Sequence, residues 1–175
     1  VVGCLTFHGG DNSITYPWGN FAHEQKPRTT DDVAYAQIAK VLQTVADKNE
    51  NLGINMYNIG TMHSVVYDVH GGFEDWAYGA SWDKRNVGRT CAMKYKSPPL
   101  NSSTVLDYPS QTNRAFIYLV EAGDSKVPAE HTLGNELALF EPDAENAIWG
   151  NVTRNIALSM KFVEVIHPYV VIKSV

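Results

Sequence analysis

Titratable side chains gather around a pair of adjacent glycines, Gly71 and Gly72. They are Tyr67, Asp68, His70, Glu74 and Asp75, with Trp76 directly behind them. The glycines allow a turn that other residues resist, because glycine has no Cβ and accepts positive φ. The apolar run from Met62 to Val66 predicts a strand that ends at Tyr67. Titratable groups around a turn at a strand end indicate a functional site. The alternative is a polar hairpin loop anchored by Trp76.

Two further titratable residues also follow apolar runs. Val1 to Phe7 is continuously apolar and predicts a central strand covered on both faces, with His8 at its end. Residues 115–120, Ala-Phe-Ile-Tyr-Leu-Val, predict a buried strand that leads into Glu121. Open α/β sheets place their chemistry at the carboxyl ends of strands. For His8, the alternative is a strand-end histidine that hydrogen-bonds to the backbone. For Glu121, the alternative is a carboxylate at the sheet edge that faces water.

A helix is predicted between the first strand and the Tyr67 strand. Thr30 is its expected N-cap, with Asp31 and Asp32 in the first turn, and the helix is expected to end near Asn49. The expected buried stripe is Ala34, Ile38, Val41, Leu42 and Val45. A strand–helix–strand order implies a right-handed crossover and a parallel pair of strands. Residues 55–60 are expected to form a loop.

The second half of the chain is predicted to end in a long helix from Asp143 to His167. Its expected buried stripe is Ile148, Val152, Ile156, Met160 and Val163, and Gly150 is a weak point. Residues 169–172 are expected to begin a new strand. Residues 83–111 are irregular and predict a long surface insertion. Loops of this length commonly serve as lids, bind partners or are disordered.

The composition limits the classes of function. The chain has 175 residues, is 44% hydrophobic and suits one globular domain. Its net charge of -5 gives nucleic-acid binding no electrostatic support, and no apolar run is long enough to span a bilayer. Cys4 and Cys91 either pair or are both free. Asn101 and Asn151 lie in glycosylation sequons, which favour a secreted, extracellular or secretory-pathway location.

The three strand ends, in this order, resemble the zinc metallocarboxypeptidases of the funnelin family, most closely the carboxypeptidase N/E-like branch. Residues 7–10, Phe-His-Gly-Gly, followed by Tyr16-Pro17, resemble the segment with the third zinc ligand. Residues 67–78 resemble the block that joins a tyrosine, a Gly-Gly turn and an Asp-Trp pair. Residues 116–121 with 126–128 resemble the strand that carries the catalytic glutamate.

The resemblance implies a fold and a set of domain boundaries. The fold would be α/β, with a mixed, mainly parallel central sheet flanked by helices in an α/β/α arrangement. Residues 1–167 would be the C-terminal half of a catalytic domain, with the insertion at 83–111. Residues 168–175 would begin a following β-sandwich domain.

The resemblance also assigns roles to individual residues. His8 would be a zinc ligand, Glu121 the general base that activates the zinc-bound water, and Tyr67 a cap over the substrate's C-terminus. Zinc lowers the pKa of its bound water and polarises a carbonyl, and a carboxylate within reach is a competent base. Glu74 falls at the floor of the family's specificity pocket and would favour C-terminal Lys or Arg. The N/E-like branch often has an uncharged amide there.

The family's other two zinc ligands form a His-x-x-Glu pair, and this chain contains no such pair. A catalytic zinc needs three protein ligands, so one histidine is too few. We therefore expect an upstream half of the same catalytic domain as a partner, and we expect residues 1–175 alone to be insoluble or molten.

Two functions follow from these expectations. The first is a zinc-dependent exopeptidase that acts on peptide or protein C-termini when the upstream half is present. The second is a non-catalytic carboxypeptidase-like module in an extracellular assembly. In the second case, the insertion at 83–111 would contact a protein partner.

Overall fold

The apolar run before Glu121 forms one of the two inner strands of the sheet. The computed structural model describes residues 2–20, 29, 31–47, 56–80 and 115–167. It contains strands β1 (Gly3–His8), β2 (Asp11–Tyr16), β3 (Asn58–Thr61) and β4 (Phe116–Gly123), arranged in the order β1-β4-β2-β3. β1 is parallel to β4 and β2 is parallel to β3, whereas β2 and β4 are antiparallel. The prediction of a mixed, mainly parallel α/β sheet is confirmed.

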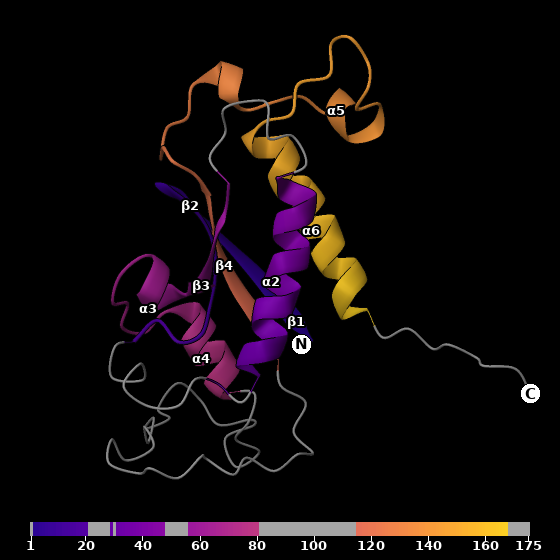
Figure 1. Cartoon of the computed structure of the whole chain (residues 1–175). Helices are drawn as coiled ribbons and strands as arrows, with labels where there is room; N and C mark the ends of the chain where they lie inside the picture. The colour runs from indigo at the N-terminus through magenta and orange to yellow at the C-terminus, as the bar shows by residue number, and fades with distance from the viewer. Residues whose placement is uncertain (1, 21–28, 30, 48–55, 81–114, 168–175) are drawn as a thin grey trace, which may run out of the picture.

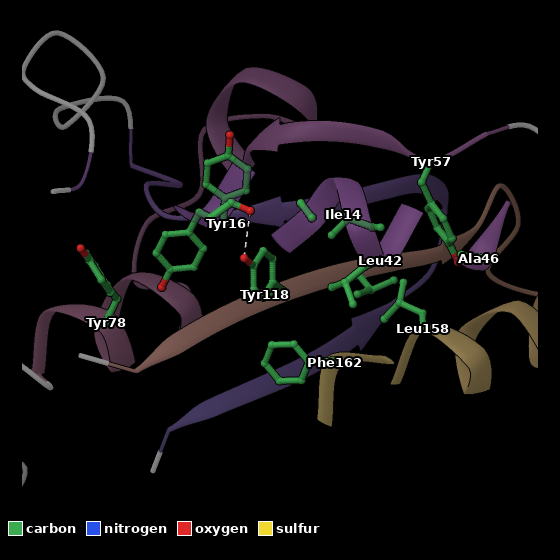
Figure 2. Close-up of a cluster of buried hydrophobic side chains, with 12 residues drawn as sticks. Ile14, Tyr16, Leu42, Ala46, Tyr57, Tyr78, Tyr118, Leu158 and Phe162 are labelled. Carbon is green, nitrogen blue, oxygen red and sulfur yellow. Dashed lines mark hydrogen bonds between the residues drawn. The ribbon is translucent and has the colours of Figure 1, made fainter. Parts of the chain in front are cut away.

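Two helices cover one face of this sheet. They are α2 (Asp32–Ala46), which connects β2 to β3, and α6 (Asn151–Ile166), which lies beside α2 (Figure 1). Ile14 and Val120 pair in register and point into the core between sheet and helices. Figure 2 shows Leu42 of α2 and Leu158 of α6 in the same buried cluster. The apolar side chains of α2 and α6 thus form one core with β2 and β4.

Tyrosines make up an unusual share of this core. Tyr35, Tyr118 and Tyr57 are at most 1% exposed. The Tyr118 hydroxyl donates to the Tyr35 carbonyl at 2.9 Å (Figure 2). The Tyr35 hydroxyl donates to the carbonyl of Ala115 at 3.1 Å, and the Tyr57 hydroxyl donates to Asn155 Oδ1 at 2.8 Å. Each ring therefore contributes apolar area without leaving its hydroxyl unbonded.

The first strand differs from its prediction. β1 lies at an edge of the sheet described here, so its residues are half-buried or exposed instead of covered on both faces. Phe7 is 49% exposed. The sequence reasoning also missed β2, because its residues Asp-Asn-Ser-Ile-Thr-Tyr follow no apolar run. The side chains of Asn12, Ser13 and Thr15 are nonetheless buried, since β2 pairs on both sides.

The prediction of a strand directly before Tyr67 is wrong. Residues Met62–Val65 form the short helix α3. The strand β3 lies before it, and all of β3 except Thr61 falls within residues 55–60, which are expected to form a loop. Thr61 explains the change, because its Oγ1 accepts a hydrogen bond from the Ser64 backbone N–H and caps the helix. The local cap therefore outweighs the preference of the β-branched residues Val65 and Val66 for a strand.

The long helices are shorter than predicted. Asp31 is the N-cap of α2, and the helix ends at Ala46. Its buried residues are Asp32, Tyr35, Ala39, Leu42, Gln43 and Ala46. Of the expected stripe only Leu42 is fully buried, and Val41 is 41% exposed. α6 begins at Asn151 with Gly150 as its N-cap, so the prediction that residues 143–150 are helical is wrong.

The predicted stripe of α6 points outward. Its buried residues are Thr153, Arg154, Leu158 and Phe162, whereas the five residues expected to be buried are 40–64% exposed. The sequence of α6 in fact carries two stripes at a spacing of four. The more polar one, which contains Arg154, faces the core.

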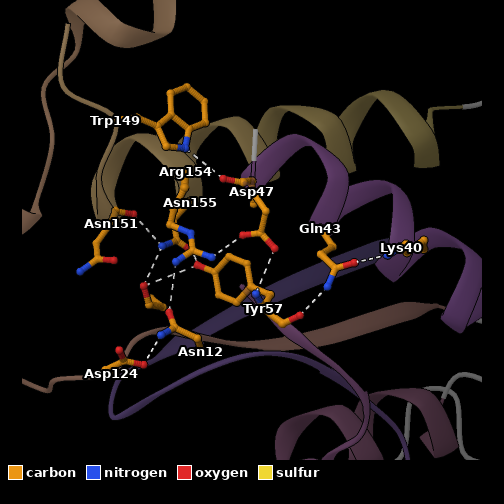
Figure 3. Close-up of polar contacts among 12 residues, drawn as sticks. Asn12, Lys40, Gln43, Asp47, Tyr57, Asp124, Trp149, Asn151, Arg154 and Asn155 are labelled. Atoms are coloured by element: carbon orange, nitrogen blue, oxygen red, sulfur yellow. Dashed lines mark hydrogen bonds and ion pairs between the residues drawn. The ribbon is translucent and has the colours of Figure 1, made fainter. Parts of the chain in front are cut away.

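Arg154 can be buried because several groups compensate its charge. Its Nη2 donates to Asp47 Oδ1 at 2.5 Å, and its Nη1 donates to Asn12 Oδ1 at 3.2 Å (Figure 3). The guanidinium lies 3.8 Å from the centre of the Tyr57 ring. Asp47 also accepts from the Tyr57 backbone N–H at 3.0 Å. This network ties the end of α2 to α6 and β2.

The remaining described elements are α4 (Phe73–Ala80), the 3₁₀ turn Glu130–Thr132 and α5 (Leu137–Phe140). Several predictions lie outside the described residues: the insertion at 83–111, Cys91, Asn101, the Thr30 cap and the strand at 169–172. Among the residues that the structure describes, no helix is long and apolar enough to cross a membrane.

Candidate functional site

Parallel pairing of β1 and β4 brings His8 and Glu121 together. The two residues are register partners at the carboxyl ends of these strands. His8 Nδ1 lies 3.1 Å from Glu121 Oε2. The Glu121 side chain is only 7% exposed, whereas that of His8 is 54% exposed. A buried carboxylate beside an accessible imidazole is an arrangement suited to proton transfer or to holding a cation.

The second part of the site is the segment between α3 and α4. Tyr67 is 63% exposed there. His70 Nε2 lies 2.9 Å from Asp68 Oδ2, and His63 Nδ1 lies 3.8 Å from Asp68 Oδ1. Gly71 has φ +74°, which confirms that the Gly-Gly pair makes a turn only glycine adopts readily. The titratable residues do surround this turn, but it leads into α4 instead of a hairpin.

Asp75 fixes α4 to the segment that follows β2. Its Oδ1 accepts from the Gly19 backbone N–H at 2.8 Å, and its Oδ2 accepts from that of Asn20 at 3.1 Å. Burial raises the pKa of Asp75 to about 6, the two backbone hydrogen bonds oppose this rise, and the neighbouring Glu74 adds to it. Asp75 therefore has a positioning role that the sequence alone did not assign.

Glu74 is the most constrained carboxylate of this segment. It is 1% exposed and lies against Gly19 and Gly72, where a Cβ on Gly72 would overlap its carboxylate. No other residue in the described part of the chain donates a hydrogen bond to either carboxylate oxygen. Burial therefore raises the pKa of Glu74. A cation that reaches a buried carboxylate without such donors stabilises its charged form.

The described residues do not form a complete zinc site. No group of three or more His, Cys, Asp or Glu among them could hold a metal ion. A single histidine such as His8 is too few, because a catalytic zinc needs three protein ligands. The Nδ1 atom cannot donate to Glu121 and bind a cation at once, so coordination through Nδ1 would replace the contact with Glu121.

The comparisons with known proteins address the family of this chain. The family model described as zinc carboxypeptidase matches residues 1–95, which is more than half of the 175 residues. The chain belongs to the zinc carboxypeptidase family. The matched residues include His8, the Gly-Gly turn and Glu74, and this zinc carboxypeptidase chain carries Glu121 beyond them. The match identifies the family and does not distinguish the N/E-like branch.

A solved structure also resembles this zinc carboxypeptidase chain. The crystal structure of the carboxypeptidase A from Helicoverpa armigera is 15% identical, with a TM-score of 0.43. The similarity covers 93% of this chain and 27% of that one, so the chain spans about a quarter of its length. No curated protein matches the chain.

Proposed function

We propose that this chain is part of a zinc-dependent exopeptidase that removes C-terminal residues from peptides or proteins. The observation that carries the proposal is the contact between His8 and Glu121 at the ends of two parallel strands. His8 would supply one zinc ligand, and Glu121 would take a proton from the attacking water. The exposed Tyr67 would cover the substrate's C-terminus.

The rest of the zinc site has to come from outside the described residues. We propose that an upstream half of the same catalytic domain supplies it, with residues 1–167 as the downstream half and 168–175 leading into a further domain. A non-catalytic carboxypeptidase-like module is the second candidate. It is favoured because the described residues contain no group of three or more His, Cys, Asp or Glu that could hold a metal ion. Residues 83–111 would then bind its partner. Location in the secretory pathway, and glycans on Asn101 and Asn151, remain part of this proposal.

Glu74 supports a preference for basic C-terminal residues. Its carboxylate is buried without a hydrogen-bond donor from another described residue, so a lysine or arginine side chain of a substrate would supply the missing partner. Family position gives the same expectation, because this residue would form the floor of the specificity pocket.

We therefore expect the parent protein to cleave a peptide ending in Arg faster than the same peptide ending in Phe. Glu74→Gln should reduce that preference by about 10- to 100-fold, the range for losing a hydrogen bond to a charged group. Initial rates on the matched peptides give the ratio directly. Glu164→Gln, on the exposed side of α6, is the control and should leave the ratio unchanged. A clear preference for Phe in the unmodified protein would contradict the assignment.

A further inference from the structure

The carboxyl group of Glu74 is buried without a partner that stabilises its charge. The residue is 1% exposed, and neither carboxylate oxygen has a hydrogen-bond partner among the described residues. Buried polar groups are nearly always bonded in folded proteins, so an orphaned carboxyl points to a ligand or a proton that completes it. The protonated form avoids most of the cost of burying a charge. The charge of Glu74 therefore depends on what else reaches it.

The groups packed against Glu74 are uncharged. Gly72 lies directly against the carboxylate, where a Cβ would overlap it, and a Cβ on Gly19 would lie 3.3 Å from Glu74 Oε1. The same Cβ on Gly19 would lie 3.2 Å from Met62 Cγ. The two glycines thus admit the carboxyl group to a place lined by backbone and by a thioether side chain. None of these groups favours a negative charge over a neutral carboxyl.

The neighbouring carboxylate, Asp75, takes the hydrogen-bond donors at this point of the structure. Its oxygens accept from the backbone N–H groups of Gly19 and Asn20, at 2.8 and 3.1 Å. Burial raises the pKa of both carboxyl groups, that of Asp75 to about 6. When Asp75 is ionised, its charge opposes a second negative charge on Glu74. The pair therefore binds protons more tightly than two exposed carboxylates would.

The cationic groups of the same segment are engaged elsewhere. His70 Nε2 lies 2.9 Å from Asp68 Oδ2, and His63 Nδ1 lies 3.8 Å from Asp68 Oδ1. In the part of the chain that the structure describes, no basic side chain bonds to Glu74. A cation that neutralises Glu74 has to come from a bound molecule.

We propose that Glu74 exchanges a proton for the cationic side chain of a substrate, so that the preference for basic over neutral C-terminal residues increases with pH. A protonated Glu74 accommodates a neutral side chain. When a lysine or arginine side chain enters, the carboxyl group releases its proton to water and the carboxylate pairs with the cation. The inference rests on the proposed role of Glu74 in the specificity pocket and adds control by pH to it.

The direction of the effect follows from the linkage between proton and ligand binding. Below the pKa that Glu74 has in the empty pocket, a cationic side chain binds only after a proton leaves, so its affinity falls as the pH falls. A neutral side chain requires no such loss. The ratio of the two affinities therefore rises with pH through the pKa of Glu74, by at most about tenfold per pH unit.

Binding of L-arginine and L-phenylalanine to the parent protein tests the proposal. The two amino acids have the same α-amino and α-carboxyl groups, so the ratio of their dissociation constants cancels every titration outside the side-chain pocket. Between about pH 5 and about pH 8, we expect the preference for L-arginine to rise at least tenfold in the unmodified protein. Glu74→Gln should show a preference that does not change with pH. Glu164→Gln, on the exposed side of α6, is the matched control and should keep the full rise.

Two outcomes of this titration would overturn the proposal. One is a constant ratio in the unmodified protein, and the other is a rise that persists in Glu74→Gln, since another group would then carry the proton. If Glu74→Gln does not fold, calorimetry of the unmodified protein in two buffers of different ionisation enthalpy counts the protons. Near the midpoint of the rise, L-arginine should release up to about one proton more than L-phenylalanine. Equal proton release would also overturn the proposal.

Peptide hydrolysis separates this inference from the proposed function. A parent protein that cleaves Arg-ending peptides with the same preference at every pH retains the exopeptidase function and overturns the inference. A protein that binds L-arginine with the expected pH dependence, but hydrolyses no peptide, supports the proton exchange and contradicts the exopeptidase function.

Discussion

The Glu121→Gln variant of the parent protein is expected to lose about 10²- to 10⁴-fold in the rate of peptide hydrolysis while keeping its zinc. Glutamine has the size of glutamate, and its amide oxygen can still accept a hydrogen bond from His8 Nδ1, which lies 3.1 Å from the present carboxylate. It cannot take a proton from water. The change therefore removes the base and leaves the packing of this buried position intact.

Two measurements on the same samples make this expectation specific. Hydrolysis is followed by mass spectrometry of a peptide that loses its last residue, and metal content is measured by elemental analysis. His8→Ala is the matched comparison, because it should lose zinc as well as activity, whereas Glu121→Gln should lose activity alone. Full turnover by Glu121→Gln would show that another group acts as the base.

The second large effect is on stability. Arg154→Met is expected to lower the free energy of unfolding by about 3–5 kcal/mol, because it leaves the Asp47 carboxylate buried without its cation. The side chains of Arg154 and Asp47 are only 1% and 6% exposed. The same change removes the cation over the Tyr57 ring and the donor to Asn12. Urea unfolding of the parent protein measures the difference.

A second ion pair in the same helix provides the control. Lys161 and Glu164 are paired at 2.7 Å, yet their side chains are 28% and 57% exposed. Water screens such a pair, so Lys161→Met should change the free energy of unfolding by less than about 1 kcal/mol. Replacing both partners of the buried pair, Arg154→Met with Asp47→Leu, should recover much of the loss. If Arg154→Met and Lys161→Met changed the free energy of unfolding by the same amount, the claim that the buried ion pair of Arg154 stabilises the fold would be refuted.

The sequence predicts those elements whose local pattern agrees with their final environment. Residues 115–120 are apolar throughout, and β4 is indeed an inner, largely buried strand that carries Glu121. The run before His8 likewise becomes β1. Because both strands are correct, the positions of His8 and Glu121 at or near their carboxyl ends could be predicted from sequence. Their contact could not, since it depends on β1 and β4 being parallel neighbours.

The errors arise where a tertiary or capping contact decides the structure. The strand β2 is polar, so no local pattern predicts it. It can be buried because its Asn12 side chain bonds with Arg154 and Asp124 from distant parts of the chain. The apolar run from Met62 to Val66 predicts a strand, yet Met62–Val65 form a helix because Thr61 caps it. No local pattern reports either contact.

Helix α6 shows the same limit for the choice of buried face. Hydrophobicity alone favours the stripe from Ile148 to Val163, since the other stripe begins with an arginine. The structure buries Arg154, Leu158 and Phe162 instead, because Asp47 and Tyr57 compensate the charge. The signal that could have revealed this is that residues 154, 158, 162 and 166 repeat at the same spacing of four.

The central claim is that this chain contributes one zinc ligand and the general base to an exopeptidase. The most direct test is the release of a single C-terminal residue by the parent protein before and after removal of its metal with a chelator. We predict release by the untreated protein, loss of release after chelation, and recovery when zinc is returned. A folded parent protein that binds zinc but releases no C-terminal residue from Arg- or Phe-ending peptides would contradict the claim and favour the non-catalytic module.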